Sequence, residues 1–210
     1  MALAMAIPGA PPLPQQSPPT PLDPASLQAR DQHEGLLVAV DLCADTACAS
    51  ARFGKQNPVQ AGILPVEVYL RNDGAEPLRI RLEEIRLEVD PATGQHQELL
   101  PLSAEEVGER IAYPAGSASP ENPGTRPHVG FGLPGRDKKA GKIATNLQPL
   151  MLDTDLVGPH STVHGFLFFD LSRDFVLIPD SSLYVPNVRA LNGDRRLTYF
   201  EVSLKAARKP

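Results

Sequence analysis

The chain has 210 residues, of which 41% are hydrophobic, so it can bury the core of one ordinary domain. Its formal charge of −5 argues against a basic nucleic-acid-binding surface, and no apolar run approaches the roughly 20 residues that cross a bilayer. The 23 prolines and 16 glycines argue against a helical bundle and favour short strands separated by turns.

The N-terminal residues 1–33 predict a signal-peptide remnant followed by an extended, proline-rich linker. Eight prolines lie between Pro8 and Pro24, and each of them removes a backbone donor. The small apolar residues 1–10 resemble the end of a secretory signal peptide. We therefore expect an exported product whose true start lies upstream. A disordered tail on a cytosolic protein is the alternative.

Two cysteines, Cys43 and Cys48, flank a short polar turn in the segment C-A-D-T-A-C. In an exported protein this spacing predicts a small structural disulfide, which contributes about 2 kcal/mol in the chain-entropy model. A redox-active pair usually has two intervening residues rather than four, and a metal site has only Asp41 and Asp45 nearby. We interpret the pair as a disulfide and predict no metal and no cofactor. Free thiols are the alternative.

The residues after the linker alternate as half-buried strands do. Residues 35–42 are apolar and predict a first strand. In residues 62–74 three apolar side chains alternate with Glu67, Tyr69 and Arg71, which predicts one buried face and one wet face.

A change of phase divides the next stretch of strand. Apolar side chains alternate from Leu78 to Leu82 and then restart out of phase at Ile85. Because a one-residue slip turns every side chain to the other face, a bulge or a change of sheet is predicted near residues 83–84. Residues 97–101 predict a short return strand.

One helix is predicted between the strands. Ser103 and Glu106 have the spacing of a capping box, and the helix is expected to end near Ala112, before a proline. Residues 113–136 are rich in glycine, proline and serine without any period, so we expect a disordered insertion or a functional loop. Residues 137–148 predict a weaker second helix.

The C-terminal third returns to strand. Residues 161–171 are aromatic and apolar on both faces, which predicts a central strand of the core. Asn192 and Gly193 predict a hairpin between residues 184–191 and 197–204, whereas Pro186 predicts an edge or a bulge in its own strand.

The order of the predicted elements determines the fold class that we expect. The predicted elements are strands, then one inserted helix, then strands again, and strands and helices do not alternate. This order predicts an all-β antiparallel sandwich of about seven to eight strands. We expect one domain over residues 34–210, in which residues 103–149 are an insertion of a short helix and a long loop.

Two groups of residues resemble ligand sites without meeting their geometry. Residues 130–135 match G-x-G-x-x-G, but a proline-rich loop precedes them, so we interpret the match as chance. Asp153, Asp155, His160 and His164 are the densest group of metal-ligand types. Histidines four residues apart on a strand lie about 13 Å apart, so we expect a polar approach to the next strand instead.

Five segments, in this order, resemble a set of uncharacterised exported bacterial proteins. They are residues 62–74, the strands from Ile80 to Leu87, the helix 103–110, residues 164–170 and residues 197–204. The resemblance covers about residues 35–204, and its motifs are structural. It implies an immunoglobulin-like sandwich, a domain of unknown function, in the bacterial envelope, and it brings no catalytic residue.

No sequence motif indicates an enzyme, so we predict a non-enzymatic, exported protein-interaction or structural module. Its expected partner is another envelope protein, bound through a strand edge or the loop at residues 113–136, in the periplasm or outside the cell, with the cytoplasm as the alternative. A small basic cluster predicts a solvated loop, or else a patch for an acidic partner or lipid headgroups. This cluster consists of Arg136, Lys138, Lys139 and Lys142.

Two other functions remain as alternatives. A small-ligand or carbohydrate-binding module would need an aromatic side chain on a solvent-facing strand, for which Tyr69 is the best-placed candidate. A hydrolase or metal protein would be centred on His160 and His164. We predict no nucleic-acid partner and no transmembrane segment in the chain as given.

Overall fold

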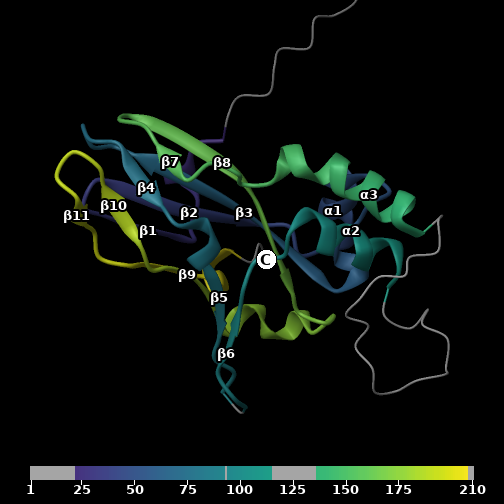
Figure 1. Ribbon diagram of the computed structural model, residues 1–210. Coiled ribbons are helices and arrows are strands. Elements are labelled where there is room, and N and C mark those ends of the chain that lie inside the picture. The colour runs from purple at the N-terminus through teal and green to yellow at the C-terminus, as the bar shows by residue number, and fades with distance from the viewer. Residues whose placement is uncertain (1–21, 93, 115–135, 208–210) are drawn as a thin grey trace, which may run out of the picture.

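A computed structural model describes residues 22–92, 94–114 and 136–207 of the chain (Figure 1). These residues are mostly β, with three antiparallel sheets and few short helices. The glycine motif at 130–135 and most of the predicted loop lie outside the described residues. No helix among the described residues is both long enough and apolar enough to cross a membrane.

Each sheet has four strands. Their order is β1-β2-β3-β8 in sheet A, β11-β10-β4-β7 in sheet B and β12-β9-β5-β6 in sheet C. The strands are β1 (Arg30–His33), β2 (Leu36–Leu42), β3 (Ile63–Asn72), β4 (Leu78–Ile80), β5 (Arg86–Val89), β6 (Gln97–Leu99), β7 (Leu156–Val157), β8 (Ser161–Asp170), β9 (Ser181–Val185), β10 (Val188–Ala190), β11 (Arg195–Arg196) and β12 (Phe200–Ser203).

The three α-helices gather on one side of sheet A, at the right of Figure 1. The α-helices are α1 (Thr46–Phe53), α2 (Ala104–Ala112) and α3 (Arg136–Leu147). The 3-10 helices are η1 (Pro24–Ser26), η2 (Val59–Ala61), η3 (Leu82–Glu84), η4 (Gln148–Leu150), η5 (Phe175–Asp180) and η6 (Leu204–Ala207).

Sheet A lies between the larger apolar core on one face and smaller apolar clusters on the other face. Strand β3 pairs with β2 on one side and with β8 on the other, and its side chains alternate between the two faces. Val66 and Val68 belong to the larger core, which also contains buried side chains of sheets B and C. On the other face Phe166 and Phe168 belong to a second core with α1, α2 and α3.

The position of β8 corrects one prediction. We expected a central strand, but β8 lies at the end of sheet A. It is apolar on both faces because Phe166 and Phe168 pack against the helices while Leu167 and Phe169 enter the larger core.

The two central strands of sheet B continue through a bend into the two central strands of sheet C. The chain leaves β4 in sheet B, passes through η3 and enters β5 in sheet C, as the phase change near residues 83–84 predicted. Opposite this bend, β9 of sheet C runs into β10 of sheet B through Pro186 and Asn187. Ile85 follows η3 and is fully buried, so it anchors the bend in the core.

The chain also forms structure that the sequence pattern did not predict. Residues 30–33, which we assigned to the linker, form β1 and pair with β2. Glu34 and Gly35 make the connecting turn with φ values of 47° and 85°, the left-handed conformation that two-residue hairpin turns require. The proline-rich composition ends at Pro24, so nothing prevents pairing beyond it.

Helix α1 occupies the position where we predicted a polar turn between the cysteines. Asp45 caps the helix, because its side chain accepts a hydrogen bond of 2.8 Å from the backbone N–H of Cys48. Cys43 and Cys48 form a disulfide, with their Cα atoms 5.5 Å apart. The disulfide therefore ties the first turn of α1 to the residue that follows β2.

The two remaining helices match their predictions. The capping box of Ser103 and Glu106 is present at the start of α2. Gly108 allows α2 and α3 to pack closely, since a Cβ at this position would lie 2.6 Å from the carbonyl oxygen of Ala140.

The predicted hairpin at Asn192 and Gly193 connects β10 with β11.

Candidate functional site: an arginine face on sheet B

The outer face of sheet B carries a row of arginines on neighbouring strands. Arg79 of β4 lies directly opposite Arg189 of β10, and Arg189 lies directly opposite Arg196 of β11. Their sequence neighbours Leu78, Ile80, Val188 and Ala190 are buried, so the alternation of the strand turns the arginines outward. We call Arg79, Arg81, Arg189 and Arg196 the arginine face.

This arrangement is electrostatically unfavourable by itself. Adjacent strands lie about 4.8 Å apart, and like charges placed directly opposite each other destabilise a sheet. The chain as a whole is acidic, with a formal charge of −5. The arginine face is therefore a local reversal of the overall charge.

Three acidic side chains partly neutralise the face. Their ion pairs are Arg79 with Asp155 at 3.3 Å, Arg81 with Glu84 at 3.1 Å and Arg189 with Asp194 at 3.1 Å. The side chain of Asp194 is 83% exposed, and the side chains of both members of the Arg79 pair are more than half exposed. Exposed pairs of this kind contribute only about 0–1 kcal/mol, so an incoming anion can exchange with the acidic partners.

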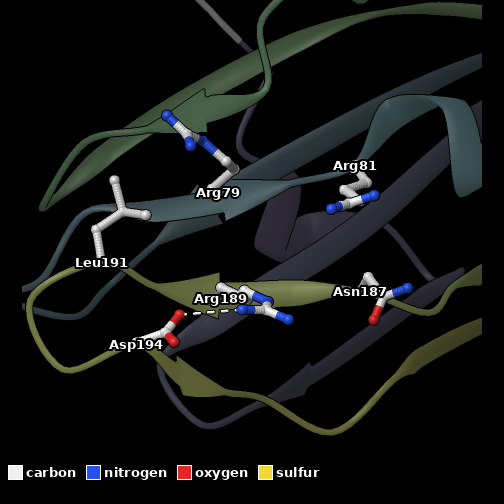
Figure 2. Close-up of a pocket in the computed structure, with 6 residues that line it drawn as sticks. All are labelled: Arg79, Arg81, Asn187, Arg189, Leu191 and Asp194. Carbon is white, nitrogen blue, oxygen red and sulfur yellow. Dashed lines mark hydrogen bonds and ion pairs between the residues drawn. The ribbon is translucent and has the colours of Figure 1, made fainter.

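A shallow surface pocket of about 220 Å³ lies among these arginines (Figure 2). Arg79 reaches the pocket from β4, Arg81 reaches it from the position between β4 and η3, and Arg189 reaches it from β10. The figure also shows the ion pair of Arg189 with Asp194. Asn187 lines the same pocket at the bend between sheets B and C.

Asn187 and the arginines share Glu84 as a partner. The side-chain amide of Asn187 donates a hydrogen bond to the Glu84 carboxylate. That bond lowers the pKa of Glu84 below its ordinary value, and the charges of Arg81 and Arg196 lower it further. Glu84 therefore stays ionised and holds Asn187 and Arg81 in place.

Two exposed leucines flank the arginine face. Leu156 of β7 lies directly beyond Arg79 in the same row, because β7 pairs with β4 at Leu156 and Arg79. Leu191 follows β10 and lines the pocket. Leu156 is 43% exposed and Leu191 is 40% exposed, so the face combines guanidinium groups with apolar contact area.

A guanidinium group can donate two parallel hydrogen bonds to a carboxylate or phosphate, so the arginine face is chemically equipped to bind an anionic group. The residues that line the pocket offer no hydroxyl, thiol or imidazole group.

A second cluster of polar side chains lies on the outer face of sheet A, which we predicted to be exposed to solvent. Glu67 is buried, and Arg52 of α1 donates hydrogen bonds both to Glu67 and to Asp41. His164 Nδ1 lies 3.2 Å from Glu67 Oε1. The charges of this network are thus paired within the protein, and α1 covers a face that the alternation alone assigned to solvent.

Tyr69 belongs to the same network and corrects another prediction. Its ring stacks on that of His164 at 5.2 Å, and only 6% of the residue is exposed. Burial, together with the neighbouring Glu67, raises the pKa of the Tyr69 hydroxyl far above its ordinary value. Tyr69 is therefore not a solvent-facing aromatic residue that could bind a carbohydrate.

The other candidate ligand residues have separate roles. Asp155 pairs with Arg79 and His164 with Glu67, while His160 is exposed in the turn before β8 with a φ of 51°. Among residues 22–92, 94–114 and 136–207, no cluster of three histidine, cysteine or acidic side chains is placed to hold a metal ion.

The predicted basic cluster lies on helix α3 rather than in a loop. Lys139 Nζ donates a hydrogen bond of 3.2 Å to the carbonyl oxygen of Ala112, so it also joins α3 to α2. Lys138 and Lys142 are exposed on α3.

The arginine face was not predicted, although part of its signal is visible in the sequence. Arg79 and Arg81 alternate with apolar residues in one strand, as Arg189 does in another. Nothing local indicates that the two strands are neighbours with Arg79 opposite Arg189.

Comparison of the chain with models of protein families, with curated protein sequences and with solved structures gave no match in any of the three.

Proposed function

We propose that this protein is an exported, non-enzymatic binding module with an immunoglobulin-like sandwich fold, which binds an acidic segment of another envelope protein. The observation that carries the proposal is the row of Arg79, Arg189 and Arg196 on the outer face of sheet B. Three like charges opposite one another destabilise the sheet. Retaining them is therefore most simply explained by a role in binding.

A polypeptide partner accounts for both components of the face. Carboxylates of the partner replace the weakly held Asp155 and Asp194 on the guanidinium groups. Apolar side chains of the same segment cover Leu156 and Leu191. Arginine is also enriched in protein interfaces, whereas a simple phosphate ligand would leave the leucines uncovered.

Export is supported by the disulfide between Cys43 and Cys48, since such bonds persist in oxidising compartments. The sandwich assignment is supported by the larger core, which contains side chains of sheet A together with those of sheets B and C. The loop at residues 115–135 lies outside the described residues and has no role in this proposal.

The test is a titration of the full chain with a fluorescent ten-residue peptide that contains glutamates and two leucines. Arg189→Glu is expected to weaken binding by at least about tenfold, because it places a carboxylate at the centre of the row. Lys205→Glu is the matched control, with the same change of charge in η6, and is expected to change binding less than about twofold.

Ionic strength provides a second readout. Raising the salt concentration from about 50 mM to about 500 mM is expected to weaken binding by about tenfold, since exposed charges are screened. Equal effects of Arg189→Glu and Lys205→Glu would show attraction by net charge alone and would overturn the proposal. No binding of the peptide at low salt would overturn it as well.

A further inference from the structure

The outer face of sheet C presents two tyrosines next to each other. Tyr184 of β9 points outward, since its neighbours Leu183 and Val185 are fully buried. Tyr199 immediately precedes β12, and the ring centroids of the two tyrosines are 5.2 Å apart at an angle of 35°. Tyr199 is 49% exposed, so its ring offers an accessible apolar surface.

An arginine packs over the ring of Tyr184. The guanidinium of Arg86 lies 4.5 Å from the centroid of the Tyr184 ring. Arg86 Nε is in turn 3.0 Å from Glu88 and 3.5 Å from Glu98. Arg86 therefore restrains the Tyr184 ring, and Tyr199 packs against that ring, so less side-chain freedom is lost when a ligand binds.

Acidic and hydroxyl groups surround the tyrosine pair. Glu201 lies opposite Tyr184 in the register of β12 and β9, and it accepts a hydrogen bond of 3.0 Å from the Ser182 hydroxyl. Glu88, Glu98 and Glu201 together exceed the single charge of Arg86, so this face repels anionic ligands. A neutral molecule with many hydroxyl groups can donate hydrogen bonds to these carboxylates.

We propose that the outer face of sheet C binds a neutral, β-linked saccharide chain. The apolar C–H face of one sugar ring stacks on Tyr199, and the sugar hydroxyls donate to Glu201 and Glu98. An extended, ribbon-like chain suits this surface because strands keep their outer side chains in near-planar rows. The site is separate from the arginine face and does not depend on the proposed function.

The test uses the full chain and two probes, the β-1,4-linked hexasaccharides of glucose and of N-acetylglucosamine. Binding is followed by chemical-shift changes up to millimolar saccharide. Tyr199→Ala is expected to weaken binding by at least about tenfold, because it removes the aromatic ring on which the apolar face of the sugar stacks. Tyr199→Phe retains the ring and is expected to retain binding.

Two control variants test whether saccharide binding is confined to the outer face of sheet C. Tyr113→Ala removes a tyrosine at the end of α2, and Arg189→Glu disrupts the arginine face; both are expected to leave saccharide binding unchanged. The proposal is wrong if neither hexasaccharide binds, or if Tyr199→Ala binds as well as the unmutated chain. Weaker binding of the acidic peptide by Tyr199→Ala, without saccharide binding, would instead assign this face to the protein interface.

Discussion

The outer faces of sheets B and C carry different side chains, although the same two stretches of chain form the central strands of both sheets. Arg79 and Arg189 face outward in sheet B, whereas Arg86 and Tyr184 face outward in sheet C. The inward side chains of both halves belong to one core cluster. The inner positions thus form the core, while the outer positions of the same strands carry different side-chain chemistry.

The two faces also differ in how far their charges are compensated within the protein. Arg86 contacts two carboxylates and a tyrosine ring, so its charge is largely satisfied by neighbours. Arg189 lies between two other arginines, and within the described part of the chain its one ion pair is with the highly exposed Asp194. We therefore expect mutations on sheet B to affect binding more than stability, and mutations at Arg86 to affect stability.

The largest effect is expected where the two halves meet. Ile85→Ala removes a fully buried side chain at the bend and is expected to lower the free energy of unfolding by about 2–5 kcal/mol. Denaturant unfolding measures the loss. Because the bend supports both faces, peptide binding and saccharide binding should decline together as the variant unfolds. A cost below about 1 kcal/mol would contradict the role of Ile85 as the anchor of the bend.

The same substitution on the two faces is expected to have opposite effects on stability. Arg189→Thr removes the repulsion from Arg79 and Arg196 and should raise the free energy of unfolding by about 0.5 kcal/mol. Arg86→Thr breaks contacts with Glu88 and Tyr184 and should lower it by about 1 kcal/mol. Paired denaturant curves measure both. No gain in the free energy of unfolding for Arg189→Thr would show that the arginine row carries no electrostatic cost.

The smallest expected effect is the pH dependence of stability, which has opposite signs for His96 next to β6 and for Glu84 at the bend. Hydrogen bonds to Asp90 and then Glu98 raise the pKa of His96 above 6.5. The resulting stabilisation is fully present below pH 6.5 and is lost as the pH rises through the raised pKa. Glu84 behaves in the opposite way, because its stabilisation is present above pH 4.5 and is lost as the pH falls through its lowered pKa.

The measurement is an NMR titration of the His96 ring, repeated in the Asp90→Asn variant. This variant should bring the midpoint closer to the ordinary histidine value, because the strongest hydrogen-bond partner loses its charge. An unchanged midpoint would remove Asp90 as the cause.

Local signals in the sequence predicted several elements correctly. Ser103 and Glu106 specify the start of α2 through contacts three residues apart, and Asn192 with Gly193 specifies a turn. The phase change before Ile85 predicted the bend, because the side-chain period of a strand leaves no other way to keep both segments buried.

The features that were missed depend on contacts between distant parts of the chain. Helix α1 was not recognised as a helix, and its contacts with sheet A include Phe53 on Phe166 as well as Arg52 on Glu67. Glu67 and Tyr69, which alternation assigned to solvent, are both buried. Ala25 and Leu27, from a distant part of the sequence, pack against the cluster that contains Tyr69. The arginine face exists only in the register of Arg79 with Arg189, which no local pattern encodes.

The continuity of the strands through η3 and through Pro186 fixes the distance between the two faces. A partner that carries both an acidic segment and a saccharide chain would bind the second face intramolecularly once the first is occupied. For linked sites the effective concentration can reach the millimolar range, and avidity can exceed either single affinity by about 10²–10⁴-fold. Two individually weak surfaces on the adjoining sheets B and C would then bind such a partner far more tightly than any molecule that presents only one of the two ligands.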